Sequence, residues 1–369
     1  MGKFKINSGK YFKNSERERE EDNKEIEGKT TQETREKIIK DRFSNIKNAK
    51  SYISKINNRF NENFNIEECI GAGSESFVYK TKIKKNGRII ATKMIVRDIG
   101  EKANINEINI SKKLKNLNII NIYGASTIRK DEVDCIMMEF TKFGNLRDFQ
   151  KKLKRNILSE SFLCFMTYQI LNALNHCHKC KIAHLDLKPQ NIVVDESLNL
   201  KLIDFSISID YSQIYSEEII MPLRGTNFYI SPEILSSRTI KVKDINKIDL
   251  YSLGVILYNL AFGHYPFGLN EKDVDDFSSI YNKITSNFEI KNDKNYSPYF
   301  IDFLGKLLEK DIDKRIDIYE ALNHYWVKGG ELLFKEKENL YNIGNFLIYL
   351  ITDHFKSFND YIKKEILFF

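Results

Sequence analysis

The sequence lacks any apolar run long enough to cross a membrane, and we expect no signal peptide. The longest apolar run near the C-terminus, Phe346 to Ile351, is far shorter than the roughly 20 residues that a membrane-spanning helix needs. The N-terminus is polar and charged, which argues against a secretory signal peptide. We therefore expect a protein without a membrane span, located in the cytoplasm, with the nucleus left open as a second compartment.

Cysteine is scarce and scattered, with five residues at positions 69, 135, 164, 177 and 180. An odd, irregular set suits a reducing compartment and argues against a disulfide framework. The run His176-Cys177-His178-Lys179-Cys180 contains a C-x-x-C flanked by imidazoles. A structural zinc site needs four ligands, and no second Cys/His pair stands at suitable spacing. We expect this run to end a helix rather than to bind a metal.

The charge also lacks a strong bias. The 58 Lys and Arg residues exceed the 51 Asp and Glu residues by 7, and this excess is spread along the chain. A nucleic-acid-binding protein would usually concentrate its basic residues on one face, so we expect no nucleic-acid partner. The run from Lys151 to Arg155 has two interpretations, an import or nucleic-acid patch and a solvated helix face. The second is favoured.

The chain of 369 residues divides into four parts. Residues 1–30 are rich in Lys, Glu and Asn and predict a disordered tail. Residues 31–63 predict a helical extension, either a short coiled coil or, as we favour, a helix packed on the next domain. Residues 64–327 begin with short β-type runs and continue with helical periodicity. Residues 328–369 predict an amphipathic helical extension that docks on that domain or on a partner. The two extensions are the candidate sites for a regulatory partner.

A glycine-containing turn between two β-type runs covers Ile70 to Val78. Gly71 and Gly73 allow the backbone to turn tightly and to approach phosphate oxygens, while Val78 lies on a strand where it can cover a flat ring. Taken alone the pattern is weak, because such turns are common and Ser76 stands in place of a third glycine.

A lysine, Lys93, lies inside the apolar β-type run that follows. A lysine in this setting is costly unless it is paired. Glu107, on the next helical segment, is the expected partner, and such a pair positions a lysine on the α and β phosphates of a nucleotide. A surface salt bridge is the alternative, which the apolar setting of Lys93 disfavours.

The most specific pattern is Ile182-Ala-His-Leu-Asp-Leu-Lys-Pro-Gln-Asn-Ile-Val-Val194. Phosphoryl transfer to a hydroxyl needs a carboxylate to accept the proton, a cation near the transferred group, and metal ligands. Asp186, Lys188 and Asn191 fit these three needs. Beyond them an apolar strand ends at Asp204, a carboxylate suited to Mg²⁺.

Over roughly residues 64–327 the chain resembles the eukaryotic protein kinases of the serine/threonine type. The matching motifs are, in order, the glycine-containing loop, Ala91-x-Lys93, Glu107, Met138-Glu139, His184-x-Asp186-x-Lys188-x-x-Asn191, Asp204-Phe205, Ser231-Pro232-Glu233, Asp249 and Arg315. The resemblance implies an α+β bilobal fold with a β-rich N-lobe, a helical C-lobe and ATP between them. It also implies transfer of the ATP γ-phosphate, with Mg²⁺, to serine or threonine hydroxyls of protein substrates.

Roles for individual residues follow from the resemblance. The catalytic residues would be Asp186 as the base, Lys188 beside it, and Lys93 on the phosphates, while Asn191 and Asp204 would hold Mg²⁺. In the implied ATP-binding site, the side chains at 78, 91 and 193 would enclose the adenine, and that at 138 would be the gatekeeper. The full implied set is Ile70, Gly71, Ala72, Gly73, Ser74, Glu75, Ser76, Phe77, Val78, Ala91, Lys93, Glu107, Met138, Glu139 and Val193.

Further residues also match the family's pattern. Glu233 would pair with Arg315, and Asp249 would brace the catalytic loop from a buried helix. The serine/threonine type is indicated by Lys188-Pro189 after the catalytic aspartate. It is also indicated by Thr226, which would bridge the catalytic aspartate and lysine.

The chain departs from the family's pattern at several positions. Leu185 replaces an arginine that grips a phosphorylated activation segment, so residues 206–224 need not be phosphorylated for activity. Ser206 stands where a glycine is usual, which restricts the local backbone. Ser111 stands where an aliphatic residue packs between the lobes, which predicts a looser helix around Glu107 and dependence on a partner or a flanking segment.

The main alternative is a pseudokinase, a scaffold with the same fold and little turnover. Such proteins usually lose the lysine, the catalytic aspartate or the metal-binding aspartate, and here Lys93, Asp186 and Asp204 are all present. A small-molecule or lipid kinase is disfavoured because those families usually lack the Ser231-Pro232-Glu233 segment. Active phosphate transfer is therefore the favoured hypothesis.

Overall fold

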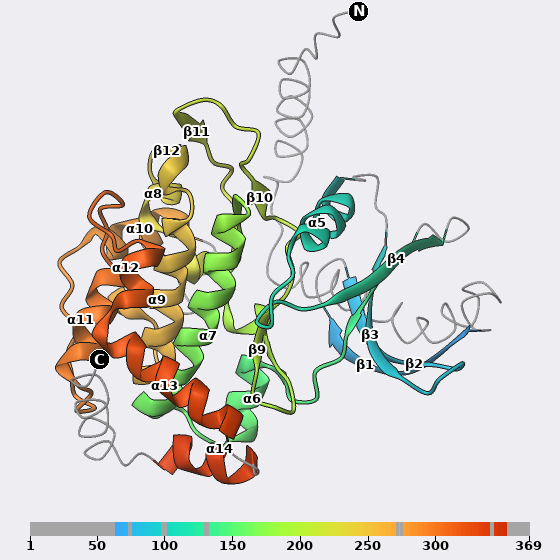
Figure 1. The fold of residues 1–369 in the computed structure, drawn as a ribbon. Helices are drawn as coiled ribbons and strands as arrows, with labels where there is room; N and C mark the ends of the chain where they lie inside the picture. The colour runs from blue at the N-terminus through green and yellow to red at the C-terminus, as the bar shows by residue number, and fades with distance from the viewer. Residues whose placement is uncertain are drawn as a thin grey trace, which may run out of the picture. The chain divides into compact units, whose positions relative to one another are not determined.

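Figure 1 shows the fold in a computed structural model that describes residues 63–352 apart from 73–75, 97–101, 129–132, 271–272, 274–275 and 340–342. The chain divides into two units, Met1–Asn63 and Phe64–Phe369, and every element below lies in the second. The predicted tail at 1–30 and, apart from Asn63, the predicted extension at 31–63 lie outside the described residues, as do residues 353–369.

One lobe is built on a five-stranded antiparallel sheet, drawn in blue to teal in Figure 1. Its strands are β1 (Phe64–Ala72), β2 (Ser76–Ile83), β3 (Ile89–Val96), β4 (Ile122–Ile128) and β5 (Val133–Glu139), in the order β1-β2-β3-β5-β4. Asn86-Gly87 is a favoured hairpin turn, and Gly87, at φ +70°, closes the β2–β3 hairpin. Helix α5 (Lys102–Lys113) lies beside β4 in this lobe.

The other lobe is helical and is centred on α9 (Lys247–Phe262), which is buried on all sides. A helix that is apolar all round belongs in a core, and Gly263 ends α9 in the left-handed conformation. Ser159 and Ser297 cap the N-termini of the helices that follow them. The remaining helices up to residue 323 are α6 (Leu146–Lys152), α7 (Glu160–Lys179), α8 (Pro232–Leu235), α10 (Phe277–Thr285), α11 (Pro298–Leu307) and α12 (Ile318–Asn323).

Short strands and 3₁₀ turns lie between the longer elements along the rest of the chain. The strands are β6 (Gly144–Asn145), β7 (Ile182–Ala183), β8 (Ile192–Val194), β9 (Leu200–Leu202), β10 (Ile209–Asp210), β11 (Glu218–Ile220) and β12 (Thr239–Lys241). They pair as β6-β8-β9, β10-β7 and β11-β12. The 3₁₀ turns are η1 (Pro189–Asn191), η2 (Asn227–Tyr229), η3 (Val242–Asp244) and η4 (Pro266–Gly268). The expected α+β fold with a β-rich and a helical lobe is confirmed.

Two further helices, α13 (Tyr325–Asn339) and α14 (Ile343–Thr352), pack on α7. The ring of Phe346 packs edge-on against that of Phe165, with 5.3 Å between the ring centroids. Phe346 and Leu350 are buried. The described part of the predicted C-terminal extension thus lies on the helical lobe. Among the described residues, no helix combines the length and apolar character that crossing a bilayer requires.

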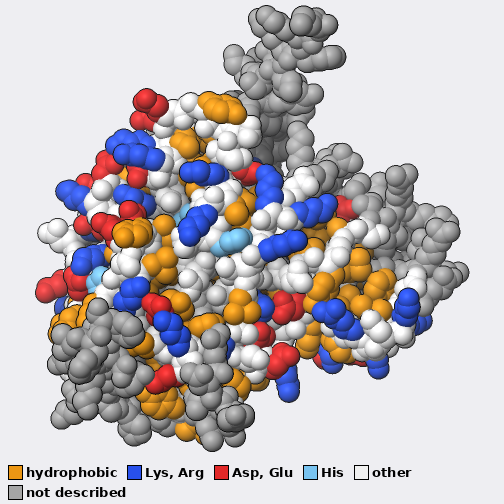
Figure 2. Space-filling view, in the orientation of Figure 1, with side chains coloured by type: hydrophobic (Ala, Val, Ile, Leu, Met, Phe, Trp, Pro, Cys, Tyr) orange, Lys and Arg blue, Asp and Glu red, His pale blue; other side chains and the backbone are white. Residues whose placement is uncertain are grey.

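On the face shown in Figure 2, basic side chains are interspersed with acidic and uncharged ones. Exposed ion pairs between elements include that of Lys241 in β12 with Asp313, at 3.0 Å. Such exposed pairs are screened by solvent and add little to stability. On this face the basic side chains are therefore mixed with acidic and uncharged ones.

Gly330 sets how closely α13 approaches α7. A Cβ atom at this position would lie 2.3 Å from the carbonyl oxygen of Cys164 and 3.0 Å from Cβ of Tyr168. We expect Gly330→Ala to lower the free energy of unfolding by about 2 to 3 kcal/mol, because the two helix backbones must move apart. Thermal unfolding would show a fall in Tm of roughly 5 to 10 °C.

Gly305 provides the matched control. It lies in α11, is exposed, and has no atom within 4 Å of where its Cβ would be. Gly305→Ala should raise stability by about 0.5 to 1 kcal/mol, because alanine is the better helix former. Equal effects at the two glycines would contradict the close approach of α13 to α7.

Candidate active site

The loop after β7 is held by hydrogen bonds to Asp249, a fully buried residue of α9. The backbone N–H groups of His184 and Leu185 donate to the Asp249 carboxylate at 2.9 and 2.7 Å, and His178 Nε2 lies 3.3 Å from it. Burial opposes the carboxylate charge, but these hydrogen bonds outweigh it, so the pKa of Asp249 is lowered. Leu185 has a φ of +66°, a conformation that is costly for a branched residue and that the Asp249 contacts hold in place.

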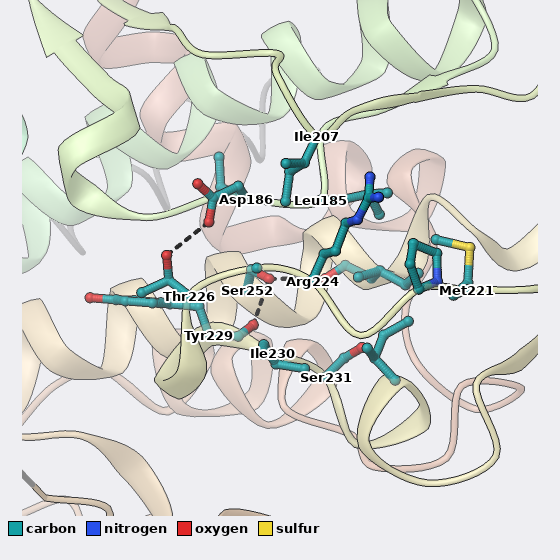
Figure 3. Close-up of a pocket in the computed structure, with 15 residues that line it drawn as sticks. Leu185, Asp186, Ile207, Met221, Arg224, Thr226, Tyr229, Ile230, Ser231 and Ser252 are labelled. Carbon is teal, nitrogen blue, oxygen red and sulfur yellow. Dashed lines mark hydrogen bonds between the residues drawn. The ribbon is translucent and has the colours of Figure 1, made fainter. Parts of the chain in front are cut away.

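The carboxylate of Asp186 is the centre of a hydrogen-bonded group of four side chains. Lys188 Nζ and Asn191 Nδ2 donate to Asp186 Oδ2 at 2.7 and 2.9 Å. Thr226 Oγ1 donates to Oδ1 at 2.8 Å, a contact drawn in Figure 3, and it accepts a hydrogen bond from Lys188 Nζ at 2.8 Å. Charge-assisted bonds to both oxygens hold this carboxylate in one orientation.

Lys93 of β3 lies between two carboxylates. Its Nζ is 2.9 Å from Glu107 Oε2 of α5 and 3.0 Å from Asp204 Oδ1. Burial works against the lysine charge, but the two carboxylates outweigh it and the pKa of Lys93 is raised. Burial also opposes the charge on Asp204, yet Lys93 more than offsets it and the pKa of Asp204 is lowered. The pKa of Glu107 is raised because burial exceeds the effect of Lys93. The pairing expected from the sequence is thus present, and Asp204 joins it.

Asn191 and Asp204 both carry side-chain oxygen atoms, and the backbone joins their segments, because the N–H of Ile203 donates to the carbonyl oxygen of Asn191 at 3.0 Å. The Asn191 amide nitrogen is committed to Asp186, so its side-chain oxygen remains available as an acceptor. A carboxylate together with an amide oxygen is a donor set that suits Mg²⁺. These residues therefore fit the metal that the sequence implies.

Asp204 has a φ of +64°, so the left-handed turn lies at this residue and aims its carboxylate at Lys93. Ser206 is not among the residues with positive φ. The serine in place of the usual glycine therefore causes no backbone strain here.

The apolar residues expected around a nucleotide base gather in one cluster between the lobes. Val78, Ala91, Met138 and Val193 belong to it and come from β2, β3, β5 and β8. Three of the four are buried, and Val78 is partly buried. Four separate strands therefore bring together the side chains that the resemblance implies around an adenine ring.

The glycine-containing loop joins β1 to β2. Ile70, Gly71 and Ala72 end β1 while Ser76, Phe77 and Val78 begin β2, with a shifted register near Gly71. Ile70 is exposed. Gly73, Ser74 and Glu75 lie outside the described residues.

Glu139, at the end of β5, uses its side chain for a contact that the sequence analysis missed. Its Oε1 is 3.2 Å from Nζ of Lys201 in β9, and the same amine donates to the carbonyl oxygen of Leu117 at 3.0 Å. Lys201 is buried. The available signal was a lysine between two apolar residues of a strand, as at Lys93, but nothing in the sequence indicated its partner.

Glu233 and Arg315 form a bidentate ion pair within the helical lobe. The guanidinium Nη1 and Nη2 lie 2.7 and 2.8 Å from the two carboxylate oxygens. Its Nε donates to the carbonyl oxygen of Glu309 at 2.8 Å, and the Arg315 side chain is fully buried. The pair fastens α8 to the segment before α12.

A small cavity of about 20 Å³ lies beside Asp186, as Figure 3 shows. Apolar side chains make up most of its wall, including Leu185, Ile207, Met221 and Ile230. Leu185 also packs on a buried apolar cluster that contains Met221 and Ile230. Apolar packing therefore joins the Asp186 loop to the segment after Asp204.

The cysteine and histidine run at 176–180 is divided among separate contacts. His178 lies against Asp249, His176 Nε2 accepts a hydrogen bond from the backbone N–H of Lys115 at 3.2 Å, and burial raises the pKa of Cys177. The run ends α7. Within the described part of the chain, no three His, Cys, Asp or Glu side chains are grouped as a metal site would require.

Comparison with known proteins identifies the family. Residues 64–327 match the protein kinase domain. This match covers well over half of the 369 residues, so the chain belongs to the protein kinase family. The resemblance inferred from the sequence motifs is confirmed.

Several curated proteins are similar over the same region. Serine/threonine-protein kinase ULK3 of Xenopus laevis is 33% identical over 72% of this chain and 55% of its own length. Serine/threonine-protein kinase 4 homolog B of Dictyostelium discoideum is 31% identical over 71% of this chain and 22% of its own length. Aurora kinase of Schizosaccharomyces pombe is 29% identical, with 72% and 71% covered. The chain thus spans about half or less of the length of the first two relatives.

Proposed function

We propose that the protein is a serine/threonine kinase that transfers the γ-phosphate of ATP to hydroxyls of protein substrates. The observation that carries this proposal is the Asp186 carboxylate, which Lys188, Asn191 and Thr226 hold through both of its oxygens. A carboxylate held in this way can accept the proton of an attacking hydroxyl. The neighbouring ammonium can neutralise charge on the transferred phosphoryl group.

The nucleotide is assigned from the other half of the site. Lys93, raised in pKa and held by Glu107 and Asp204, is a fixed cation suited to the α and β phosphates of ATP. Asn191 and Asp204 would hold Mg²⁺, which neutralises phosphate charge when bound.

The acceptor is assigned as serine or threonine on two grounds. Thr226 contacts both Asp186 and Lys188, as the serine/threonine type of the family implies. The first two relatives described above are named serine/threonine-protein kinases. Asp186 and Lys93 are both held by the partners that transfer requires, which favours turnover over a scaffold role.

The test is phosphate transfer from ATP and Mg²⁺ to a generic protein substrate by the full chain, with analysis of the phosphorylated amino acids. We expect phosphoserine or phosphothreonine as the product. Phosphotyrosine alone would contradict the assigned acceptor. An inert protein that still binds ATP would contradict the enzyme and favour the scaffold.

Activity should not depend on phosphorylation of the segment that follows Asp204. Leu185 holds this segment by apolar packing, at the position where the family has an arginine that grips a phosphate. We expect phosphatase treatment to change turnover by less than about twofold, since apolar packing does not need an added charge to form. Mass spectrometry would establish that the treated enzyme carries no phosphate.

A variant tests the same point by a second route. Ser212, Tyr215 and Ser216 are exposed on this segment, so Ser212→Ala, Tyr215→Phe and Ser216→Ala together remove three acceptors without disturbing the core. This variant should keep the wild-type rate. Loss of nearly all turnover in both preparations would show that the segment does require phosphate.

A further inference from the structure

Helix α5, which carries Glu107, is packed unevenly. Ile110, near its C-terminal end, is buried in the large apolar core. Ser111 is also buried, and its hydroxyl has no hydrogen-bond partner among the described residues. A buried hydroxyl without a partner is unfavourable, and serine fills less space than an aliphatic residue. Apolar packing therefore holds the part of α5 that follows Glu107 less firmly than an aliphatic residue at position 111 would.

Polar contacts connect α5 to the segment after Asp204. The side-chain amide of Asn106 donates to the backbone carbonyl oxygen of Ser208 at 2.9 Å and to that of Ser206 at 3.4 Å. At the C-terminal end of the helix, Lys113 forms an ion pair with Asp210. Both contacts join the same two elements.

The Asn106 contact closes a ring of interactions around Lys93. Glu107 and Asp204 reach Lys93 from α5 and from the loop after β9. Asn106, the neighbour of Glu107, joins the same two elements without involving the lysine. Either carboxylate would lose its contact with Lys93 if these elements separated.

We propose that Asn106 is a positioning residue that holds α5 against residues 206–208, so that Glu107 and Asp204 contact Lys93 together. The proposal rests on the proposed function only in assigning Lys93 to the phosphates of ATP. Asn106 acts here through its two N–H donors and does not touch the nucleotide. Its hydrogen bonds add to the attachment of a helix in which Ser111 contributes little packing.

The test compares hydrogen exchange in the wild-type full chain and in Asn106→Ala. We expect backbone amides of both α5 and residues 204–210 to exchange about tenfold faster in the variant, because the loss of the two hydrogen bonds favours local opening of both elements. Asn106→Asp keeps the shape but places oxygen against the two carbonyls, so it should behave no better than Asn106→Ala. Asn109→Ala, at an exposed position on the same helix, is the matched control and should match the wild type.

The kinetics of single and double variants separate this role from general destabilisation, which would lower the rate in either background. We expect kcat/KM for ATP to fall about tenfold in Asn106→Ala. In a Lys93→Met background, Asn106→Ala should have no further effect, because its role operates through that lysine. A full additional tenfold loss in that background would overturn the proposal.

The exchange measurement separates this proposal from the proposed function, because it needs no turnover. A wild-type chain that transfers no phosphate would contradict the function, while the exchange rates would still decide the role of Asn106. Exchange in Asn106→Ala equal to that in Asn109→Ala would overturn the positioning role even in an active kinase.

Discussion

Replacing Asp186 by asparagine is expected to lower kcat for phosphate transfer by roughly 10²- to 10⁴-fold, the range over which a positioned base contributes. Asparagine has nearly the same shape, but its amide cannot accept the hydroxyl proton. The amide oxygen can still accept from Lys188 and Asn191 while the amide nitrogen faces the Thr226 hydroxyl, which can also accept, so the loop should keep its conformation. KM for ATP should change little, because Lys93 and its two carboxylates form a separate group.

The measurement is the steady-state rate with saturating ATP and Mg²⁺, accompanied by nucleotide affinity and Tm for each protein. Asp302→Asn is the matched control, because Asp302 also pairs with a lysine, Lys306, but lies at the surface. It should retain the wild-type rate. An Asp186→Asn protein that is folded, binds ATP and turns over at more than a tenth of the wild-type rate would exclude Asp186 as the base.

The residues around Asp186 could be predicted from the sequence because most of them are local. Asp186, Lys188 and Asn191 lie within six residues of one another, so a single loop conformation brings them together. Lys93 was also recognisable, because a charge inside an apolar strand requires a partner. The change from β-type runs to helical periodicity predicted a sheet-rich part followed by a helical part, and the resemblance to protein kinases implied that these form two lobes.

Contacts to the backbone and between lobes could not be predicted. Asn106 donates to the backbone carbonyl oxygens of Ser206 and Ser208, and carbonyl acceptors have no signal in the side-chain pattern. Lys201 and Glu139 are 62 residues apart and face each other only after the lobes assemble. The strands β11 and β12 have three residues each, which is too short for a recognisable period.

Replacing Glu233 by glutamine is expected to lower the free energy of unfolding by about 3 to 5 kcal/mol. The Arg315 guanidinium is fully buried, and Glu233 is the carboxylate with which it forms its ion pair. Without that carboxylate the positive charge would be left with backbone carbonyls such as those of Glu309 and Lys247. Thermal or denaturant unfolding would show the loss as a fall in Tm of roughly 10 °C.

Two further variants distinguish the buried charge from the ion pair itself. Asp313→Asn removes the carboxylate of an exposed pair with Lys241 and should leave Tm unchanged within error, because solvent already compensates both charges. Glu233→Gln combined with Arg315→Met removes both buried charges and should recover much of the lost stability. Recovery would show that the cost in the single variant comes from the unpaired guanidinium. A double variant less stable than the single one would instead show that the Glu233–Arg315 attraction and the arginine's packing on Tyr251 outweigh the cost of burying the charge.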